Sequence, residues 1–147
     1  MKRLLTAGLA LAFFAPQAFA EGDAEKGEKS FNKCKSCHMI VTADGDTILK
    51  GGKTGPNLWG VVGRTAGTAD FKYSKYLVSA GEAGLVWDEE EFTAYVADPS
   101  KYLKSYLDDN KARGKMNFKL KKAEDAADIW AYLISVSPAA EGADSGS

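Results

Sequence analysis

The sequence has few histidines, cysteines and methionines, and it lacks long hydrophobic runs. Its 147 residues include one histidine, two cysteines and three methionines. A structural zinc site needs about four ligands, and the cysteines and the histidine supply three. The apolar run near the N-terminus, residues 4–15, is shorter than the ~20 residues that cross a membrane. The formal net charge of -1 gives no reason to expect a nucleic-acid partner, so we predict none.

The first 20 residues are typical of an export signal. Lys2 and Arg3 precede the apolar run, and Ala18-Phe19-Ala20 is a small-x-small cleavage pattern. A retained membrane anchor is the alternative, which the short apolar run disfavours. We therefore predict a signal peptide at 1–20 that is cleaved after Ala20, and a mature protein in the periplasm.

Both cysteines and the histidine fall in one motif, Cys34-Lys35-Ser36-Cys37-His38. The pattern C-x-x-C-H is typical of c-type haem attachment, because two thiols can bind one porphyrin while the next imidazole reaches its iron. A disulfide is the simplest alternative in an exported chain, but it leaves His38 without a role. A thioredoxin-like redox pair is disfavoured because a predicted helix, not a strand, leads into the motif. The motif predicts one covalent haem c, with Cys34 and Cys37 as thioethers and His38 as an axial iron ligand.

A second axial ligand is sought among the methionines, because there is no second histidine. Met1 is lost with the signal peptide, and Met39 follows His38 too closely to reach the opposite face of the ring. Met116 lies in a polar stretch between two predicted helices, which suits a ligand. Two alternatives stay open: Met116 fills a gap in the core, or the distal position is open or bound by Lys or Tyr. A His/Met pair raises the reduction potential and leaves no coordination position free, which favours electron transfer over oxygen chemistry.

Helical periodicity and capping residues predict a single all-α domain at 21–136 with long loops. Asp23 and Asp88 are expected N-caps, and Glu91 occupies the position that completes a capping box with Asp88. Asp44-Gly45 indicates a short hairpin, and no other strand is expected. The predicted helices are 24–35, 73–80, 88–97, 99–107 and 122–136, and residues 137–147 are expected to form a flexible tail.

A longer series of residues extends in order over positions 22–135. It consists of Gly22-Asp23, Gly27, Phe31, Cys34 to His38, Thr54-Gly55-Pro56-Asn57-Leu58, Gly60, Gly63-Arg64, Gly67, Trp87, Tyr95, Asp98-Pro99, Tyr102, Lys115-Met116-Asn117-Phe118 and Ala131-Tyr132-Leu133. This series resembles class I cytochrome c. The resemblance implies crossing N- and C-terminal helices, with further helices and long loops wrapped around one covalent haem. It also implies that Met116 is the second axial ligand.

The resemblance further implies roles for residues around the haem. The carbonyl of Pro56 is expected to accept a hydrogen bond from the His38 imidazole, which fixes its tautomer. Tyr95 is expected to form a hydrogen bond near the sulfur of Met116. Taken alone, an aromatic such as Tyr95 is simply a core residue, and a single arginine a surface charge. The residues expected to bind a haem propionate are Arg64, Tyr73 and Trp87.

Two longer segments, 42–50 and 104–113, depart from the compact mitochondrial pattern. They are similar to the larger "c-two" type cytochromes of purple photosynthetic and related denitrifying bacteria. By this resemblance we expect a soluble, monomeric periplasmic carrier of single electrons and not an enzyme. This carrier would take electrons from the bc-one complex and deliver them to a photosynthetic reaction centre or a terminal oxidase. A peroxidase and a gas-binding sensor are the alternatives, disfavoured by the lack of a second histidine.

Basic residues flank both predicted ligand segments, although the total charge is slightly negative. Since both segments must converge on the haem, we predict a basic rim that docks transiently on acidic membrane redox complexes. Electron transfer should then slow as ionic strength rises. For any single lysine, plain solvation is the simpler interpretation. The predicted docking residues are Lys33, Lys35, Lys111, Arg113, Lys115, Lys119, Lys121 and Lys122.

Overall fold

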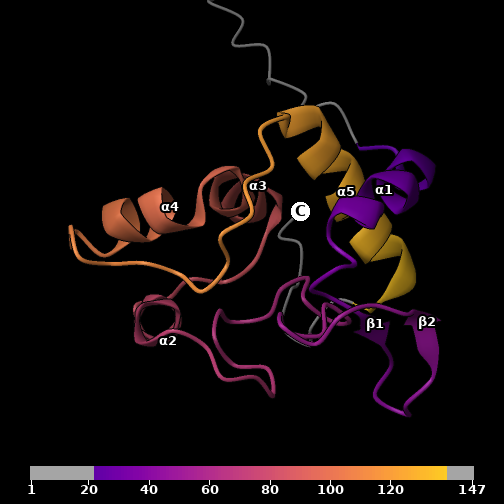
Figure 1. Ribbon diagram of the computed structural model, residues 1–147, viewed down its shortest axis with the longest axis horizontal. Coiled ribbons are helices and arrows are strands. Elements are labelled where there is room, and N and C mark those ends of the chain that lie inside the picture. The colour runs from indigo at the N-terminus through magenta and orange to yellow at the C-terminus, as the bar shows by residue number, and fades with distance from the viewer. Residues whose placement is uncertain (1–21, 139–147) are drawn as a thin grey trace, which may run out of the picture.

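The computed structural model describes residues 22–138, and helices dominate this part of the chain. Two of the helices, α1 and α5, cross on one side of the molecule, while α2, α3 and α4 lie on the other (Figure 1). Within residues 22–138 no helix has both the length and the apolar character of a membrane span. The elements are α1 (Ala24–Ser30), a 3-10 helix η1 (Phe31–Lys33), β1 (Ile40–Val41), β2 (Thr47–Leu49), α2 (Lys75–Glu82), α3 (Glu89–Ala97), α4 (Pro99–Tyr106) and α5 (Ala123–Val136).

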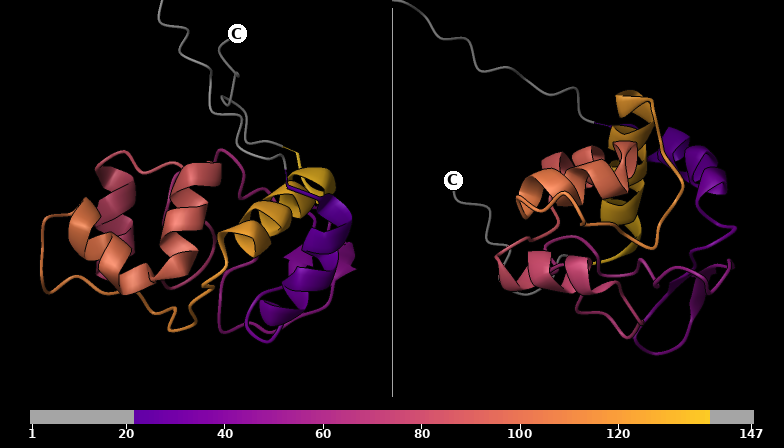
Figure 2. Two further views of the ribbon diagram at one scale, coloured as in Figure 1. Left: turned by 90° about the horizontal axis from the view of Figure 1, so that it is seen from above. Right: turned by 60° about the vertical axis from the view of Figure 1, so that its left-hand side comes forward.

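The crossing of α1 and α5 depends on a glycine. A Cβ on Gly27 would lie 1.9 Å from the carbonyl oxygen of Asp128 in α5, so only glycine permits this approach. One turn later, the ring of Phe31 packs edge-on against Tyr132 with centroids 5.7 Å apart. The Asp23 carboxylate caps α1 as predicted. The backbone N–H of Asp23 donates to the Asp128 carboxylate at 2.7 Å. Figure 2 shows α5 lying between α1 and α3.

The first helix is shorter than predicted. It ends at Ser30, and Phe31–Lys33 continue as a 3-10 helix, where we expected α-helix through residue 35. The carbonyl of Phe31 accepts both from Cys34 N–H, at 2.8 Å, and from Lys35 N–H, at 3.1 Å. This tighter turn leads the chain out of the helix just before the C-x-x-C-H motif.

The predicted hairpin at Asp44-Gly45 is present and is flanked by two short antiparallel strands, β1 and β2. Gly45 has a φ of 92°, which favours glycine, and its N–H donates to Thr42 at 3.1 Å. Ile40 is fully buried and joins β1 to the core. The chain is therefore not wholly helical, although the sheet is small and local.

The three helices on the other side begin at short polar caps. Ser74, Asp88 and Asp98 accept from the backbone of the first turns of α2, α3 and α4. The capping box at α3 is only half formed. The Asp88 carboxylate accepts from Glu91 N–H at 2.8 Å. The Glu91 carboxylate accepts from the hydroxyl of Tyr102 and so does not complete the box. That hydrogen bond joins α4 to α3.

Two stretches outside the predicted helices, the loop after α4 and the start of the predicted tail, pack against the rest of the fold where the structure describes them. After α4 the chain turns at Asp108, which has a φ of 48°, and fully buried Ala112 anchors the return. Ser137, the first residue of the predicted tail, is buried. Its hydroxyl donates to the Leu133 carbonyl at 2.8 Å, so this residue still packs against α5. The rest of that tail beyond Pro138, and the predicted signal peptide, lie outside the described residues.

Candidate functional site

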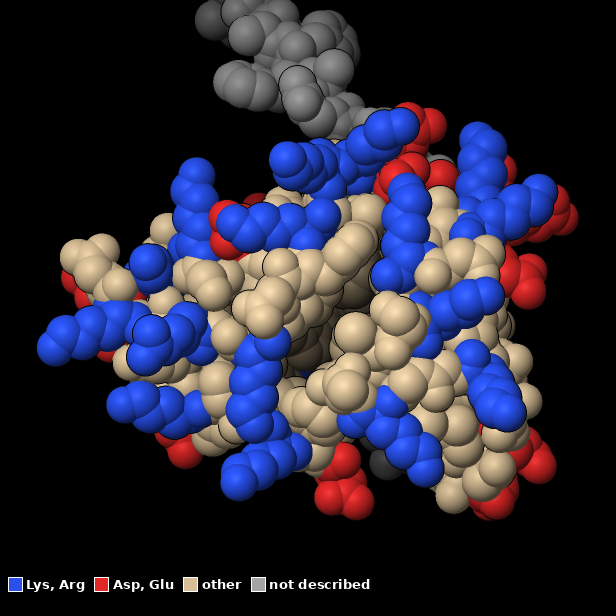
Figure 3. Space-filling view, in the orientation of Figure 1, with Lys and Arg blue, Asp and Glu red and all other residues tan. Residues whose placement is uncertain are grey.

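A cavity of about 400 Å³ lies between the two groups of helices and is lined mainly by apolar and aromatic side chains. The face shown in Figure 3 is hollowed at its centre, and lysine and arginine side chains surround the hollow. The predicted site residues that line the cavity are Cys34, Cys37, His38, Pro56, Arg64, Tyr73, Trp87, Tyr95 and Met116. Segments far apart in the sequence therefore converge on one space.

The C-x-x-C-H motif forms a tight turn at the wall of the cavity. The carbonyl of Cys34 accepts from Cys37 N–H at 3.1 Å and from His38 N–H at 2.9 Å. Both cysteines are free thiols. Burial raises the pKa of the Cys34 thiol to about 11, whereas Cys37 is exposed. The two cysteines therefore do not form the disulfide that was the simplest alternative to haem attachment.

His38 is nearly buried, and its ring orientation is fixed. The Pro56 carbonyl can only accept, so Nδ1 of His38 carries the proton and donates to it at 2.8 Å. Nε2 then has a free lone pair, as an axial iron ligand requires. Burial lowers the pKa of His38, which the hydrogen bond to Pro56 partly opposes, and the neutral ring is favoured.

Three glycines pack against the motif so closely that no side chain fits. A Cβ on Gly55 would lie 2.4 Å from Cε1 of His38. On Gly51 it would lie 1.8 Å from the His38 carbonyl oxygen, and on Gly52 2.1 Å from that of Ser36. The sequence showed only a glycine-rich loop here and gave no sign that Gly51 and Gly52 lie against the motif.

Met116 lies in a non-helical segment, residues 114–120, which we call the Met116 segment. Its side chain is half-buried and lines the cavity. Backbone pairing is sparse: Leu120 N–H donates to Val96 in α3 at 2.8 Å. Two lysines hold the flanks, since Lys115 donates to the Lys72 carbonyl and Lys119 pairs with Asp98 at 2.6 Å.

The residues predicted to bind a haem propionate or to lie near the Met116 sulfur make polar and aromatic contacts. Arg64 donates to the carbonyls of Trp59 and Asn57 at 3.2 and 3.3 Å. Burial raises the pKa of Tyr73, and the charge of Arg64 partly opposes that shift. The predicted propionate-binding residues Arg64 and Tyr73 line the same cavity.

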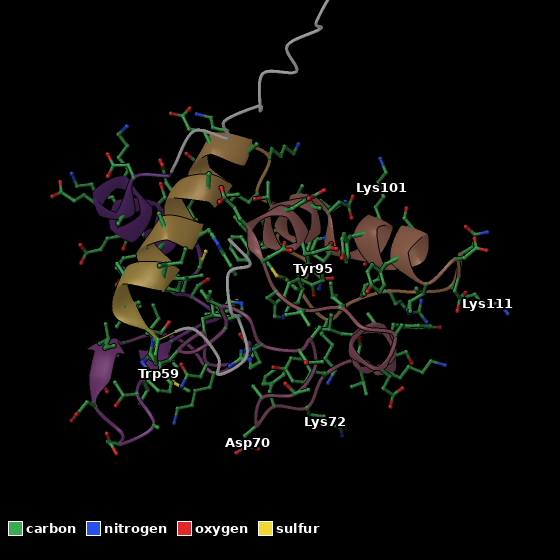
Figure 4. The ribbon with its side chains drawn as sticks, turned by 180° about the vertical axis from the view of Figure 1, so that it is seen from behind. Trp59, Asp70, Lys72, Tyr95, Lys101 and Lys111 are labelled. Atoms are coloured by element: carbon green, nitrogen blue, oxygen red, sulfur yellow. The ribbon has the colours of Figure 1, made fainter. Side chains whose placement is uncertain are left out.

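Trp87 and Tyr95 form an aromatic wall of the cavity. Their rings meet edge-on with centroids 5.0 Å apart. Tyr95 comes from α3 and lies in the interior, whereas Trp59 lies near the hairpin (Figure 4). Burial raises the pKa of Tyr95 to about 12, so its hydroxyl stays protonated and able to donate at neutral pH. A Cβ on Gly114 would lie 3.3 Å from this hydroxyl, which places Tyr95 against the Met116 segment.

Sequence reasoning missed most of the apolar lining. These residues carry no motif, and only the fold brings them to the cavity. They include Val61, Phe71, Leu77, Phe92, Val96 and Ile129.

The eight predicted docking residues are all exposed, but they are not equivalent. Lys33 and Lys115 line the cavity. Lys33 pairs with Asp125 in α5 at 2.5 Å. Lys111 lies at the outer end of the loop after α4, away from Tyr95 and the interior (Figure 4). Lys33, Lys115 and Lys119 thus have internal partners.

The residues present fit a covalent haem. The cavity size is within the about 300–1,000 Å³ typical of ligand sites. It offers two free thiols, a neutral imidazole and a thioether, and its walls are aromatic and aliphatic. The two thiols can bond to the porphyrin, and imidazole with thioether is a donor pair that holds haem iron in cytochromes c.

Comparison with known proteins agrees with this geometry. The family model described as cytochrome c matches residues 24–137, more than half of the chain. The chain belongs to the cytochrome c family. It carries one covalently bound haem c with its iron, and it is an electron-transfer protein and not an enzyme.

Individual relatives show which type of cytochrome c this chain resembles. Cytochrome c-551 of Roseobacter denitrificans is 60% identical over 137 residues, which is 93% of this chain and 97% of that protein. Cytochrome c2 of Cereibacter sphaeroides is 57% identical over 141 residues, 92% of this chain and 97% of that protein. The solved structure of cytochrome c2 from Rhodobacter sphaeroides has a TM-score of 0.78 at 60% identity and covers 80% of this chain and 98% of that one. This cytochrome c therefore has the class I fold and is of the c2 type, as predicted.

Proposed function

We propose that this cytochrome c is a soluble periplasmic carrier that takes single electrons from a bc-one complex and delivers them to a photosynthetic reaction centre or a terminal oxidase. One observation carries the proposal: two free thiols, a neutral imidazole and a thioether line a single cavity under a basic rim. The relatives named cytochrome c2 support the same class of carrier.

In this proposal each site residue has one task. Cys34 and Cys37 would hold the haem covalently, and His38 and Met116 would bind its iron. Bound in this way, haem c supplies an iron that changes its charge by one electron. The Pro56 carbonyl keeps the proton on Nδ1 of His38, so that Nε2 stays unprotonated. The protein does not need to move a proton or open a coordination position for each electron.

The residues around the proposed haem position control access of solvent and the local charge. Arg64, Tyr73 and Trp87 bind a propionate, and the protonated Tyr95 hydroxyl lies against the Met116 segment. The hydrophobic lining keeps water from the buried part of the site, which stabilises the reduced form. The result is a closed site whose potential the protein sets.

The basic rim supports transient docking on acidic partners. Positive charge around the hollow in Figure 3 raises the encounter rate without a large interface, which suits a carrier that must also leave quickly. Electron transfer to a membrane partner is therefore expected to slow as ionic strength rises. Redox titration together with reduction of isolated membrane complexes identifies the acceptor.

Carbon monoxide tests the closed site directly. Added to the reduced protein at neutral pH, it should leave the visible spectrum unchanged, because Met116 occupies the position it needs. Met116→Ala should admit carbon monoxide and lower the reduction potential. Met39→Leu is the matched control, since Met39 is the other methionine of the mature chain, and it should behave as wild type. Rapid carbonyl formation in the wild-type protein contradicts the proposed function.

A further inference from the structure

The Met116 segment has no secondary structure of its own, yet side-chain contacts hold it on both sides of Met116. On one side, Lys115 Nζ donates to the carbonyl of Lys72 and lies 5.9 Å from the centre of the Phe71 ring. Lys72 lies on the loop that precedes α2 (Figure 4). This contact joins the segment to a loop that also lines the cavity, through Phe71 and Tyr73.

On the other side, Lys119 pairs with Asp98 at 2.6 Å. Asp98 lies at the junction of α3 and α4, and its other carboxylate oxygen accepts from Lys101 N–H at 3.1 Å as the cap of α4. The neighbouring Leu120 N–H donates to the Val96 carbonyl at 2.8 Å. The segment is therefore held to two different parts of the fold, on either side of the residue that must stay in place.

We propose that Lys119 with Asp98, and Lys115 with the Lys72 carbonyl, are positioning contacts that hold Met116 in place and set how often it leaves the iron. The inference rests on the proposed role of Met116. Both ammonium groups have an internal partner, so they contribute less to docking than an exposed lysine without one. The basic rim therefore contains two kinds of lysine.

The Lys119–Asp98 pair offers the cleaner test, because both partners can be changed conservatively. Lys119→Met removes the charge and keeps the length of the side chain. Asp98→Asn removes the charge but still caps α4, since Asn and Asp are similar N-caps. Lys121→Met is the matched control: Lys121 is exposed, lies two residues further on and forms no ion pair among residues 22–138. Lys119→Arg should keep the ion pair with Asp98 and behave as wild type.

The measurement is the rate at which imidazole replaces Met116 in the ferric protein, followed by its visible spectrum at mildly alkaline pH. Imidazole is neutral there, so a lost surface charge does not alter its attraction. At saturating imidazole the rate reports release of Met116. Lys119→Met and Asp98→Asn should each raise this limiting rate roughly two- to fivefold, the range expected for one exposed ion pair.

The double variant decides whether the two residues act as one contact. If they do, Lys119→Met with Asp98→Asn should be no faster than either single variant. Faster hydrogen exchange of the Leu120 amide should accompany the change, which tests the segment without an added ligand. Equal rates for Lys119→Met and Lys121→Met, or effects that multiply in the double variant, overturn the inference. If wild type lacks a methionine-ligated spectrum altogether, the proposed function fails instead.

Discussion

The two sides of the cavity are built in different ways. The His38 side, residues 34–56, is held by backbone hydrogen bonds within the motif and by glycines that touch it. The Met116 side, residues 114–120, has sparse backbone pairing and is flanked by exposed lysines. One proposed ligand, His38, is therefore fixed by close packing. The other, Met116, is held by separate contacts that can each break without the others.

This difference has an energetic basis. Close-packed atoms cannot separate without losing many contacts at once, so displacing His38 requires the surrounding loop to move with it. An exposed ion pair contributes little and exchanges readily with water. The structure therefore predicts that ligand replacement begins at Met116 while His38 stays bound. The three predictions below test this contrast, in order of decreasing effect.

The largest effect is expected when the His38 side is overpacked. Alanine at position 55 would place a Cβ 2.4 Å from Cε1 of His38. Gly55 is not among the glycines with positive φ, so the cost arises from this contact. We expect Gly55→Ala to lower the free energy of unfolding by about 1–3 kcal/mol, as overpacking does, and to change the visible spectrum. Denaturant unfolding and spectroscopy of the haem-loaded protein measure both.

Gly45→Ala is the control for losing a glycine far from the site. Its φ of 92° makes alanine unfavourable, but no atom lies within 4 Å of the added Cβ. It should lower stability while leaving the spectrum and the reduction potential unchanged. A Gly55→Ala protein with native stability and a native spectrum would show that the His38 side is looser than its packing indicates.

The features that could be predicted from the sequence are those determined by near neighbours. Asp23, Asp88 and Asp98-Pro99 cap helices because a short polar side chain satisfies backbone donors two or three residues on. The C-x-x-C-H motif likewise carries its chemistry in five consecutive residues. Elimination among three methionines then pointed to Met116, which does line the cavity.

The features that could not be predicted depend on contacts between distant residues. The early end of α1 follows from how the chain turns into the motif, which helical periodicity does not register. Gly51 and Gly52 pack on the motif only after the hairpin has brought the chain back. Lys119 and Asp98 are 21 residues apart, so the sequence grouped Lys119 with the docking lysines and not with an internal partner.

Breaking the ion pair on the His38 side should have a smaller effect on stability than Gly55→Ala. Lys33 lies just before the motif and pairs with Asp125 at 2.5 Å, much as Lys119 pairs with Asp98. Because the motif is also held by backbone and glycine packing, Lys33→Met should leave the limiting rate of imidazole entry unchanged. Its loss of stability should be smaller than that of Gly55→Ala. An acceleration equal to that of Lys119→Met would remove the contrast between the two sides.

The smallest effect is the pH dependence that Asp98 contributes. The hydrogen bond from Lys119 is the main cause that lowers the pKa of Asp98, and the Lys101 backbone N–H adds to it. Since the pKa is lower in the folded chain than the unfolded value of about 3.9, the carboxylate stabilises the fold above that pH. The contribution is lost as pH falls through the folded pKa.

Comparison with Asp98→Asn isolates this contribution, because every other titrating group is common to both proteins. The difference in unfolding free energy between wild type and Asp98→Asn should be constant above about pH 5 and should shrink as the pH falls below about 4. Urea unfolding across this range measures it, at low ionic strength because the pair is exposed and screened by salt. In the Lys119→Met background the dependence should weaken, since the main cause of the shift is gone. A difference that is independent of pH would mean that the charge of Asp98 does not stabilise the fold.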